Sequence, residues 1–191
     1  MKLDIMPVAT EKQVKEIADS ASSIWSGYLH KLYSEEKAKF LLNELQSKEA
    51  ILKKLGQRDY YYMILLVDEK PVGLLSFFFA NNAFCIDTLY INEDMRHKGI
   101  LREVMDYMET FCRLGYPITR VLVHIPLADS ENISMFEHLG FHKVGLFEYS
   151  FHSSFGMECC TMERIPKPKP EPEQEYDFDF AFESVPDIIM D

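Results

Sequence analysis

Positive charge is scarce in this sequence. The 191 residues include 20 lysines and arginines against 31 aspartates and glutamates, so the formal net charge is −11. Proteins that bind nucleic acid present a basic face that displaces counterions from the phosphates. The composition therefore argues against nucleic acid as a partner. With 47% hydrophobic and 27% charged residues, it is instead typical of one soluble globular domain of ordinary size.

Patterns that indicate a membrane, a leader or a metal are also missing. The longest apolar run is far too short to span a bilayer, and the N-terminal stretch MKLDIMPVATEKQ has no apolar segment of the kind that a signal peptide needs. Cys85, Cys112, Cys159 and Cys160 form no C-x-x-C pair, and no histidine cluster has the spacing of a zinc site. We therefore predict a cytoplasmic protein with reduced thiols, no membrane contact and no metal.

Acidic charge is concentrated at the C-terminal end. Residues 166–191 carry eight acids and two lysines, a net charge of −6, so the preceding residues are only mildly acidic. The stretch IPKPKPEPEQ has the composition of a semi-rigid proline-rich spacer. The sequence therefore predicts three parts: a domain over residues 1–164, a linker over 165–175 and an acidic aromatic tail over 176–191.

The tail alternates aromatic with acidic side chains. Tyr176, Phe178 and Phe180 stand at the two-residue period of a strand, although the charge of the segment favours disorder. Three interpretations remain open. The tail adds as a strand to a sheet edge of its own domain or of a homodimer partner; it is a disordered, solubilising segment; or it is a pseudo-substrate flap over a pocket.

Hydrophobic periodicity predicts three helices near the N-terminus. Thr10, Ser34 and Ser47 each stand at an N-cap position before a run with apolar residues at helical spacing. A weakly alternating segment over residues 2–9 precedes them as a first strand, and Gly56 ends the third helix.

Strands dominate the rest of the domain. Three runs joined by tight turns predict an antiparallel meander over residues 59–67, 72–80 and 83–91. Because a strand–helix–strand unit follows within a mostly antiparallel set, we predict an α/β (α+β) fold, with a mixed, mostly antiparallel central sheet of about seven strands flanked by helices. The later predicted elements are a helix from Gly99 to near Gly115, a strand over 119–125, a helix over 129–139, and strands over 141–151 and 155–164.

The most informative segment is LYINEDMRHKGIL, residues 89–101. A strand ends, a polar turn follows, and a helix begins beside Gly99 and two basic residues, Arg96 and Lys98. Free N–H groups at a helix start and the helix dipole favour an anion, and a glycine lets the backbone approach a phosphate closely. The segment therefore predicts an anion-binding turn, although a solvated basic cap on an ordinary helix would have the same pattern.

Together with DSENISMFEHLGF at residues 129–141, this turn resembles the motifs of the GCN5-related N-acetyltransferase (GNAT) superfamily. LYI, RHKGIL and FEHLGF occur in the family's order and at suitable spacing, with helices before them and strands after them. The first helices and hairpin are similar to a small bacterial subgroup. The resemblance covers residues 1–164 and implies the family's fold, acetyl-coenzyme A (acetyl-CoA) as cosubstrate, and N-acetyl transfer.

The resemblance also implies a set of binding residues. Backbone amides of the turn would bind the pyrophosphate of acetyl-CoA. The strand edge at Leu89, Tyr90 and Ile91 would bind the pantetheine arm and the acetyl carbonyl, where the two central strands splay apart. The turn residues implied in this way are Arg96, His97, Lys98, Gly99, Ile100 and Leu101.

Four positions depart from the family pattern. Leu101 stands where the turn usually has glycine or alanine, and Asp129 stands where an asparagine often contacts the cofactor. Phe136 replaces a tyrosine that protonates the leaving thiolate in many members, and Cys85 stands where one branch has a glutamate base. Asp129 and Phe136 are candidate cofactor contacts by position, but an ionised carboxylate donates no hydrogen bond and a phenyl ring has no proton to give.

Asp87 is the candidate catalytic base. It follows Cys85 by two residues, so both side chains are expected on one face of the sheet. A desolvated carboxylate at the floor of a pocket can accept a proton directly or through water; a buried aspartate bonded to a neighbour is the structural alternative. Cys85 is a second catalytic candidate, as a nucleophile.

Two functions follow from these predictions. The first is an acetyl-CoA-dependent N-acetyltransferase acting on an amine of a small molecule or a protein. The second is a non-catalytic acyl-CoA-binding or interaction module with the same fold and a degenerate site, because Leu101, Asp129 and Phe136 weaken the family pattern. Binding of the cosubstrate without turnover on a broad amine panel would indicate the second.

Overall fold

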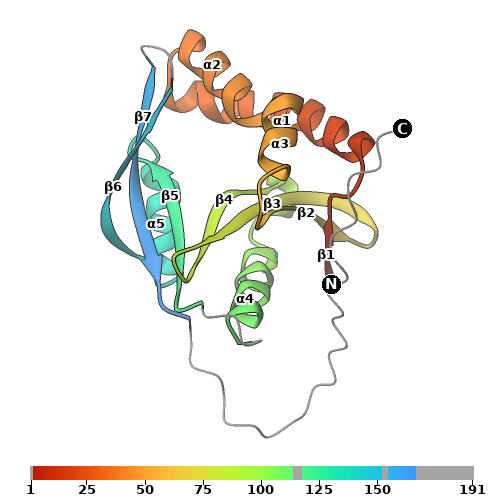
Figure 1. The fold of residues 1–191 in the computed structure, drawn as a ribbon, viewed down its shortest axis with the longest axis vertical. Helices are drawn as coiled ribbons and strands as arrows, with labels where there is room; N and C mark the ends of the chain where they lie inside the picture. Colours follow the sequence, from red (N-terminus) through yellow and green to blue (C-terminus); the bar gives the residue numbers. More distant parts are fainter. Residues whose placement is uncertain (1, 114–117, 152–154, 167–191) are drawn as a thin grey trace, which may run out of the picture.

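A seven-stranded sheet forms the centre of the molecule (Figure 1). The computed structural model describes residues 2–113, 118–151 and 155–166. The strands are β1 (Leu3–Pro7), β2 (Tyr60–Val67), β3 (Lys70–Ala80), β4 (Ala83–Ile91), β5 (Arg120–Pro126), β6 (His142–Ser150) and β7 (Gly156–Arg164). Their order in the sheet is β1-β2-β3-β4-β5-β7-β6, and every neighbouring pair is antiparallel except β4–β5. The predicted fold class is therefore confirmed.

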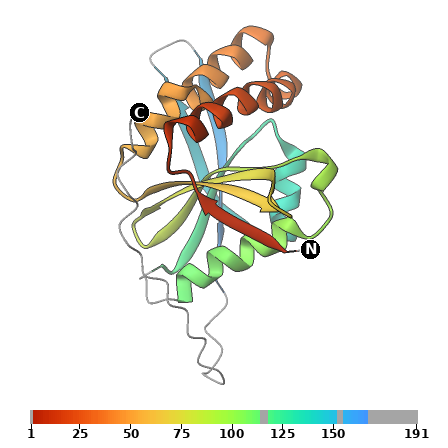
Figure 2. The same cartoon turned by 90° about the vertical axis from the view of Figure 1, so that its right-hand side faces the viewer.

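The described helices divide between the two faces of the sheet (Figures 1 and 2). One face carries α1, α2 and α3, and the other carries α4 and α5. A short 3-10 turn, η1, lies between β4 and α4. Their bounds are α1 (Glu11–Leu32), α2 (Glu35–Gln46), α3 (Lys48–Leu55), η1 (Glu93–Met95), α4 (Ile100–Arg113) and α5 (Ser130–His138).

The three N-terminal helices begin at the caps that the sequence predicts. The side chain of Thr10 accepts from the amide of Gln13, whose own side chain accepts from the amide of Thr10, which completes a capping box. The side chains of Ser34 and Ser47 accept from amides three residues ahead in the same way. These bonds satisfy N–H groups that have no intrahelical acceptor, and they fix where each helix starts.

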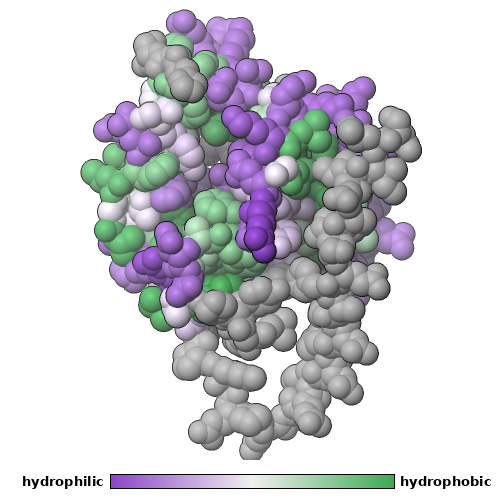
Figure 3. Space-filling model, viewed as in Figure 1, coloured by the Kyte–Doolittle hydropathy of each residue, from purple (hydrophilic) through white to green (hydrophobic). Residues whose placement is uncertain are grey.

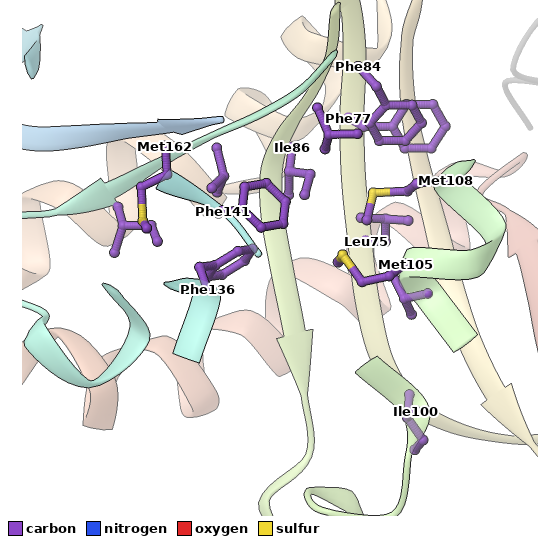
Figure 4. Packing of buried hydrophobic residues seen from close by; sticks show 14 of the residues in the cluster. Leu75, Phe77, Phe84, Ile86, Ile100, Met105, Met108, Phe136, Phe141 and Met162 are labelled. Atoms are coloured by element: carbon purple, nitrogen blue, oxygen red, sulfur yellow. The ribbon is translucent and has the colours of Figure 1, made fainter. Parts of the chain in front are cut away.

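The main hydrophobic core fills the space between the sheet and α4 with α5 (Figure 4). Phe77 of β3 stacks on Phe84 of β4 with ring centroids 4.3 Å apart, and Met108 of α4 lies beside these rings. Phe136 of α5 meets Phe141 edge to face at 5.1 Å. Because all these side chains are buried, they fix α4 and α5 against the central strands.

Two smaller clusters lie on the opposite face, under the N-terminal helices. Val14 of α1 and Ile51 of α3 pack on Tyr62 of β2. Leu29, near the other end of α1, packs instead with α2 on Cys159 of β7. The long helix α1 therefore spans from the β2–β3 part of the sheet to β7.

β4 and β5 pair over four residues, from Ala83 with Arg120 to Ile86 with Val123. Beyond this short seam β4 continues beside β3 as far as Ile91, whereas β5 continues beside β7. The two central strands therefore diverge into a wedge, here called the splay, which the resemblance implied. The edge of β4 that faces the splay is left without a strand partner among the described residues.

Among the described residues, no helix is long and apolar enough to cross a membrane. Within the same ranges, no group of three or more histidine, cysteine, aspartate or glutamate side chains could hold a metal ion. Most of the predicted linker over 165–175 and the whole tail over 176–191 lie outside the described residues.

Candidate active site

The turn after β4 adopts backbone conformations that favour glycine. His97 has φ of 62° and Gly99 has φ of 87°, both in the left-handed region. The carbonyl of Gly99, the residue directly before helix α4, accepts from the amides of Arg102 and Glu103 at 3.0 and 3.2 Å. The first amides of α4 have no acceptor within the helix, and the helix dipole adds partial positive charge to them.

This turn is open to solvent. Arg96, His97 and Lys98 are exposed, and the Arg96 Nε donates to the carbonyl of Ile91 at 3.2 Å, which holds the turn against the end of β4. A Cβ placed on Gly99 would meet no atom within 4 Å. Charge, free amides and open space therefore all fit a phosphate group at this turn.

Leu101 does not disturb the helix start. The Leu101 side chain is partly buried and packs against the main core. Helix α4 begins at Ile100, whose own side chain is fully buried. The amide of Leu101 remains at the first turn of the helix. The larger residue at this position is therefore compatible with the binding role that the resemblance implies.

The end of β4 is held close to β3. A Cβ on Gly73 would lie 2.3 Å from the carbonyl oxygen of Tyr90 and 3.3 Å from the Cα of Ile91. Leu89 and Ile91 turn their side chains into the main core, which leaves their backbone at the mouth of the splay. Close packing on the β3 side thus determines where the free edge of β4 lies.

A β-bulge occurs in β4 at the point where the splay opens. Ile86 pairs with Phe77 and Thr88 pairs with Ser76, so Asp87 has no partner on β3. Bulges commonly redirect side chains, and here Asp87 and Thr88 both face the N-terminal helices. Asp87 contacts Lys54 of α3, and Thr88 accepts from Gln46 of α2 at 3.1 Å.

The carboxylate of Asp87 is held by three donors. It accepts from the ammonium of Lys54 at 2.8 Å, from the hydroxyl of Tyr60, and from the hydroxyl of Ser76 at 3.4 Å. The side chains of Lys54 and Asp87 are 18% and 13% exposed. Desolvation by burial and the nearby Asp87 charge raise the pKa of Tyr60, so that this phenol stays protonated and donates.

Cys85 and Asp87 lie on the same face of the sheet, as predicted. Both lie near Tyr149 of β6, whose pKa is raised first by burial and then by electrostatic interaction with Asp87, Cys159 and Cys85. Burial also raises the pKa of the Cys85 thiol. A thiol that stays protonated is a weak nucleophile.

His124 lies across the splay from Asp87. It is the first residue of β5 beyond the seam, and the sequence did not single it out. Its Nδ1 lies 3.0 Å from the hydroxyl of Thr161, and its ring stacks on Phe147 at 4.4 Å. Burial lowers the pKa of His124, and the charge of Asp87 opposes that shift. The signal in the sequence is weak, because a histidine within TRVLVHI has the pattern of an ordinary strand residue.

Asp129 caps helix α5 rather than pointing freely into the splay. Its carboxylate accepts from the amide of Asn132 at 3.0 Å, from the Asn132 side-chain amide at 2.6 Å, and from the hydroxyl of Tyr28 on α1. Phe136, about two helical turns further on, is buried in the main core. The phenyl ring of Phe136 has no proton to offer a leaving group.

A mixed sheet with diverging central strands, an open turn at Gly99 and polar side chains at the apex of the splay are the features of an acyltransferase that uses acetyl-CoA. The family model described as the Acetyltransferase (GNAT) family matches residues 23–141, and the chain belongs to this family. Acetyl-CoA is the cosubstrate of the family. No curated protein matches the chain.

Solved structures share the fold at low sequence identity. The PaiA N-acetyltransferase from Thermoplasma acidophilum, in complex with coenzyme A, has a TM-score of 0.65 at 18% identity, over 86% of this chain and 99% of that one. The ribosomal-protein-S18-alanine N-acetyltransferase from Escherichia coli has a TM-score of 0.56 at 12% identity, over 89% and 97% of the two chains. A dodecameric spermidine N-acetyltransferase from Vibrio cholerae has a TM-score of 0.57 at 13% identity, over 86% and 94%.

Proposed function

We propose that this protein transfers the acetyl group of acetyl-CoA to an amine of a small molecule or of a protein. The observation that carries the proposal is the divergence of β4 from β5 after Ile86, which places an unpaired strand edge beside Asp87 and leads directly to the turn at Gly99. The bound thioester supplies an activated acetyl group. The chain binds and orients the two substrates and supplies a group that accepts the proton of the amine.

We assign binding of the cosubstrate to β4 and the turn. The backbone edge of Leu89, Tyr90 and Ile91 is proposed to hold the pantetheine arm. The first amides of α4 and the exposed side chains of the turn are proposed to hold the pyrophosphate. The turn residues in this proposal are Arg96, His97, Lys98, Gly99, Ile100 and Leu101. Asp129 and Phe136 contribute in this proposal by holding α5 in place.

The catalytic residues also remain proposals. Asp87 forms an ion pair with Lys54 and faces the N-terminal helices at the apex of the splay, so it can attract and orient a cationic amine. The raised pKa of the Cys85 thiol favours direct transfer over a covalent cysteine intermediate. Replacement of Cys85 by alanine tests the nucleophile, because direct transfer predicts that the variant retains activity.

Thermal unfolding with and without acetyl-CoA tests binding. A ligand at about 100 times its dissociation constant stabilises the native state by about 2.7 kcal/mol, which is roughly 2–4 °C for a domain of this size. The shift should be present in the wild type and absent in an Arg96→Glu/Gly99→Glu double variant. Transfer to an amine panel, followed by release of free thiol, then tests the reaction.

The non-catalytic module is the second candidate. It is supported by Phe136, a buried ring at the position where many members have a proton donor, and by the engagement of Asp87 with Lys54. Under this alternative acetyl-CoA produces the thermal shift, but no amine in the panel is acetylated. The two candidate functions therefore predict the same binding of acetyl-CoA, but only the acetyltransferase predicts turnover.

A homodimer also remains a proposal. β6 is an edge strand, and hydrophobic side chains gather over it along the left-hand side of Figure 3. Val144, Leu146 and Phe147 are 49%, 77% and 40% exposed. A second copy could add to this edge and cover them. Light scattering of the wild type and of Leu146→Asp tests this, because a dimer through β6 should dissociate in the variant.

A further inference from the structure

We propose that His124 accepts the proton that the acceptor amine releases, and that Asp87 stabilises the resulting imidazolium from the opposite side of the splay. The role rests on the proposed function and adds a catalytic residue to it. Four observations support it: the position of His124, the contacts of its ring, its electrostatic surroundings, and the engagement of Asp87 with other donors.

His124 and Asp87 are the first residues on the two strands beyond the seam. Ile86 with Val123 is the last pair between β4 and β5. Val121, Val123 and Ile125 of β5 turn into the main core. Because side chains alternate along a strand, His124 faces the opposite side, which is the side that Asp87 occupies. The two groups thus flank the apex of the splay on the face of the N-terminal helices.

Contacts on β6 and β7 hold the imidazole ring. Nδ1 lies 3.0 Å from the Thr161 hydroxyl, Phe147 stacks on the ring at 4.4 Å, and Tyr149 meets it edge to face at 6.3 Å. With the Nδ1 proton donated to Thr161, Nε2 carries the lone pair. No described residue makes a hydrogen bond to Nε2, so this atom can serve as the proton acceptor.

The charges around His124 suit a neutral base that becomes cationic. The titratable groups that face it are Asp87 on β4, Tyr149 on β6 and, further along the same face, Cys85 on β4 and Cys159 on β7. The pKa values of both thiols and of the phenol are raised, to about 12 for Cys159, so these groups are neutral at pH 7. Asp87 is therefore the charge that stabilises the imidazolium.

Asp87 is less suited to take the proton itself. Its carboxylate already accepts from the ammonium of Lys54 and the hydroxyl of Tyr60, and protonation would weaken both interactions. Burial lowers the pKa of His124, which keeps the imidazole unprotonated at neutral pH and ready to accept.

The proton balance is simple. The amine nitrogen forms its bond to the acetyl carbon as the carbon–sulfur bond breaks, and the nitrogen's proton passes to Nε2 of His124. The released thiolate takes a proton from water, and His124 returns its proton to water. The products are the N-acetylated amine and coenzyme A, and the phenyl ring of Phe136 is not required to donate.

Steady-state kinetics of His124→Gln form the first test. General-base catalysis contributes about 10²–10⁴-fold, so kcat should fall at least about 100-fold while the thermal shift with acetyl-CoA is retained. The acidic limb of the wild-type pH profile should disappear. His138→Gln is the matched control, because His138 is exposed on α5 and its ring contacts the carbonyl of Ser134, away from the splay. Activity of His124→Gln within threefold of wild type would overturn the assignment.

An NMR titration of the histidine ring protons supplies a readout that does not require turnover. The resonance lost in His124→Gln identifies His124, and its midpoint should fall further in Asp87→Asn, because the carboxylate that favours the imidazolium is removed. An unchanged midpoint would overturn the pairing of the two residues. Absence of turnover in the wild type with every amine would overturn the proposed function, whereas turnover that survives in His124→Gln overturns only the role of His124.

Discussion

Tyr28 of α1 donates a hydrogen bond to the carboxylate of Asp129, the residue that caps α5. The bond joins the helices on one face of the sheet to the helix on the other, close to the end of β5. An ionised aspartate accepts from Tyr28 and from both nitrogens of Asn132 at once, which an asparagine side chain with one oxygen cannot match. The departure from the family pattern at position 129 therefore has a structural explanation.

Removal of the Tyr28 hydroxyl should destabilise the protein. A hydrogen bond to a charged group contributes about 1.5–3 kcal/mol, so we expect Tyr28→Phe to lower the free energy of unfolding by about that amount in urea denaturation. Tyr33→Phe is the control, because the Tyr33 ring contacts Lys37 and no described residue bonds to its hydroxyl. Equal stability of the two variants would contradict the proposed link between α1 and α5.

The stability of the protein should fall in alkaline solution. Burial is the main cause that raises the pKa values of Tyr28, Tyr60, Tyr62 and Tyr149 above the ordinary value of 10.0. Below pH 10 both the folded and the unfolded states hold these protons, and the stability is complete. Above pH 10 the unfolded state releases them first, so the free energy of unfolding decreases as pH rises.

Absorbance of the phenolate checks this pH dependence. In the native protein most tyrosines should ionise well above pH 10, and in urea all should ionise near it. Tyr28→Phe should lose stability less steeply above pH 10 than the wild type does. A native titration that coincides with the titration in urea would contradict the burial of these phenols.

Gly99 and Gly140 form a matched pair of positions that tests whether the turn after β4 binds phosphate. Both have positive φ, 87° and 84°, and a Cβ at either position would meet no atom within 4 Å. Alanine at either position should therefore cost about 1–2 kcal/mol of stability through backbone strain. Only Gly99→Ala should also reduce the thermal shift with acetyl-CoA. A full shift in Gly99→Ala would show that the turn conformation is not needed for binding.

Gly73 and Gly27 test the position of the β4 edge. Alanine at 73 would place a Cβ 2.3 Å from the carbonyl oxygen of Tyr90, whereas a Cβ at Gly27, exposed in the C-terminal half of α1, would meet nothing within 4 Å. Gly73→Ala should cost about 1–3 kcal/mol and weaken acetyl-CoA binding, measured by calorimetry. Gly27→Ala should stabilise the fold by about 0.5–1 kcal/mol with unchanged affinity.

Much of the fold could be predicted because its signals are local. Ser34 and Ser47 stand directly before apolar helical periodicity, and the bonds that they make in the structure involve residues three positions ahead. The meander over β2, β3 and β4 needs only short turns between alternating runs. These elements depend on neighbouring residues, so one sequence is enough to identify them.

The partners of the site residues could not be predicted in the same way. Asp87 meets Lys54 because the register of β4 shifts at the bulge and because α3 packs over β2. His124 lies at the apex of the splay only because the pairing of β5 with β4 ends at Val123, the residue directly before it. Both relationships depend on strand register and on contacts between segments far apart in the chain, and neither has a signature in the composition.

The short seam between β4 and β5 has a consequence for folding. Apart from those four residue pairs and the hydrogen bond from the amide of Thr119 to the carbonyl of Asn82, the described β1–β4 and β5–β7 halves of the sheet are joined by side-chain packing, through α1 and the cores. Hydrogen exchange should therefore report two cooperative units, with the amides of β5–β7 opening independently of those of β2–β3. A cosubstrate bound in the splay would contact both halves, and the two units should then exchange as one.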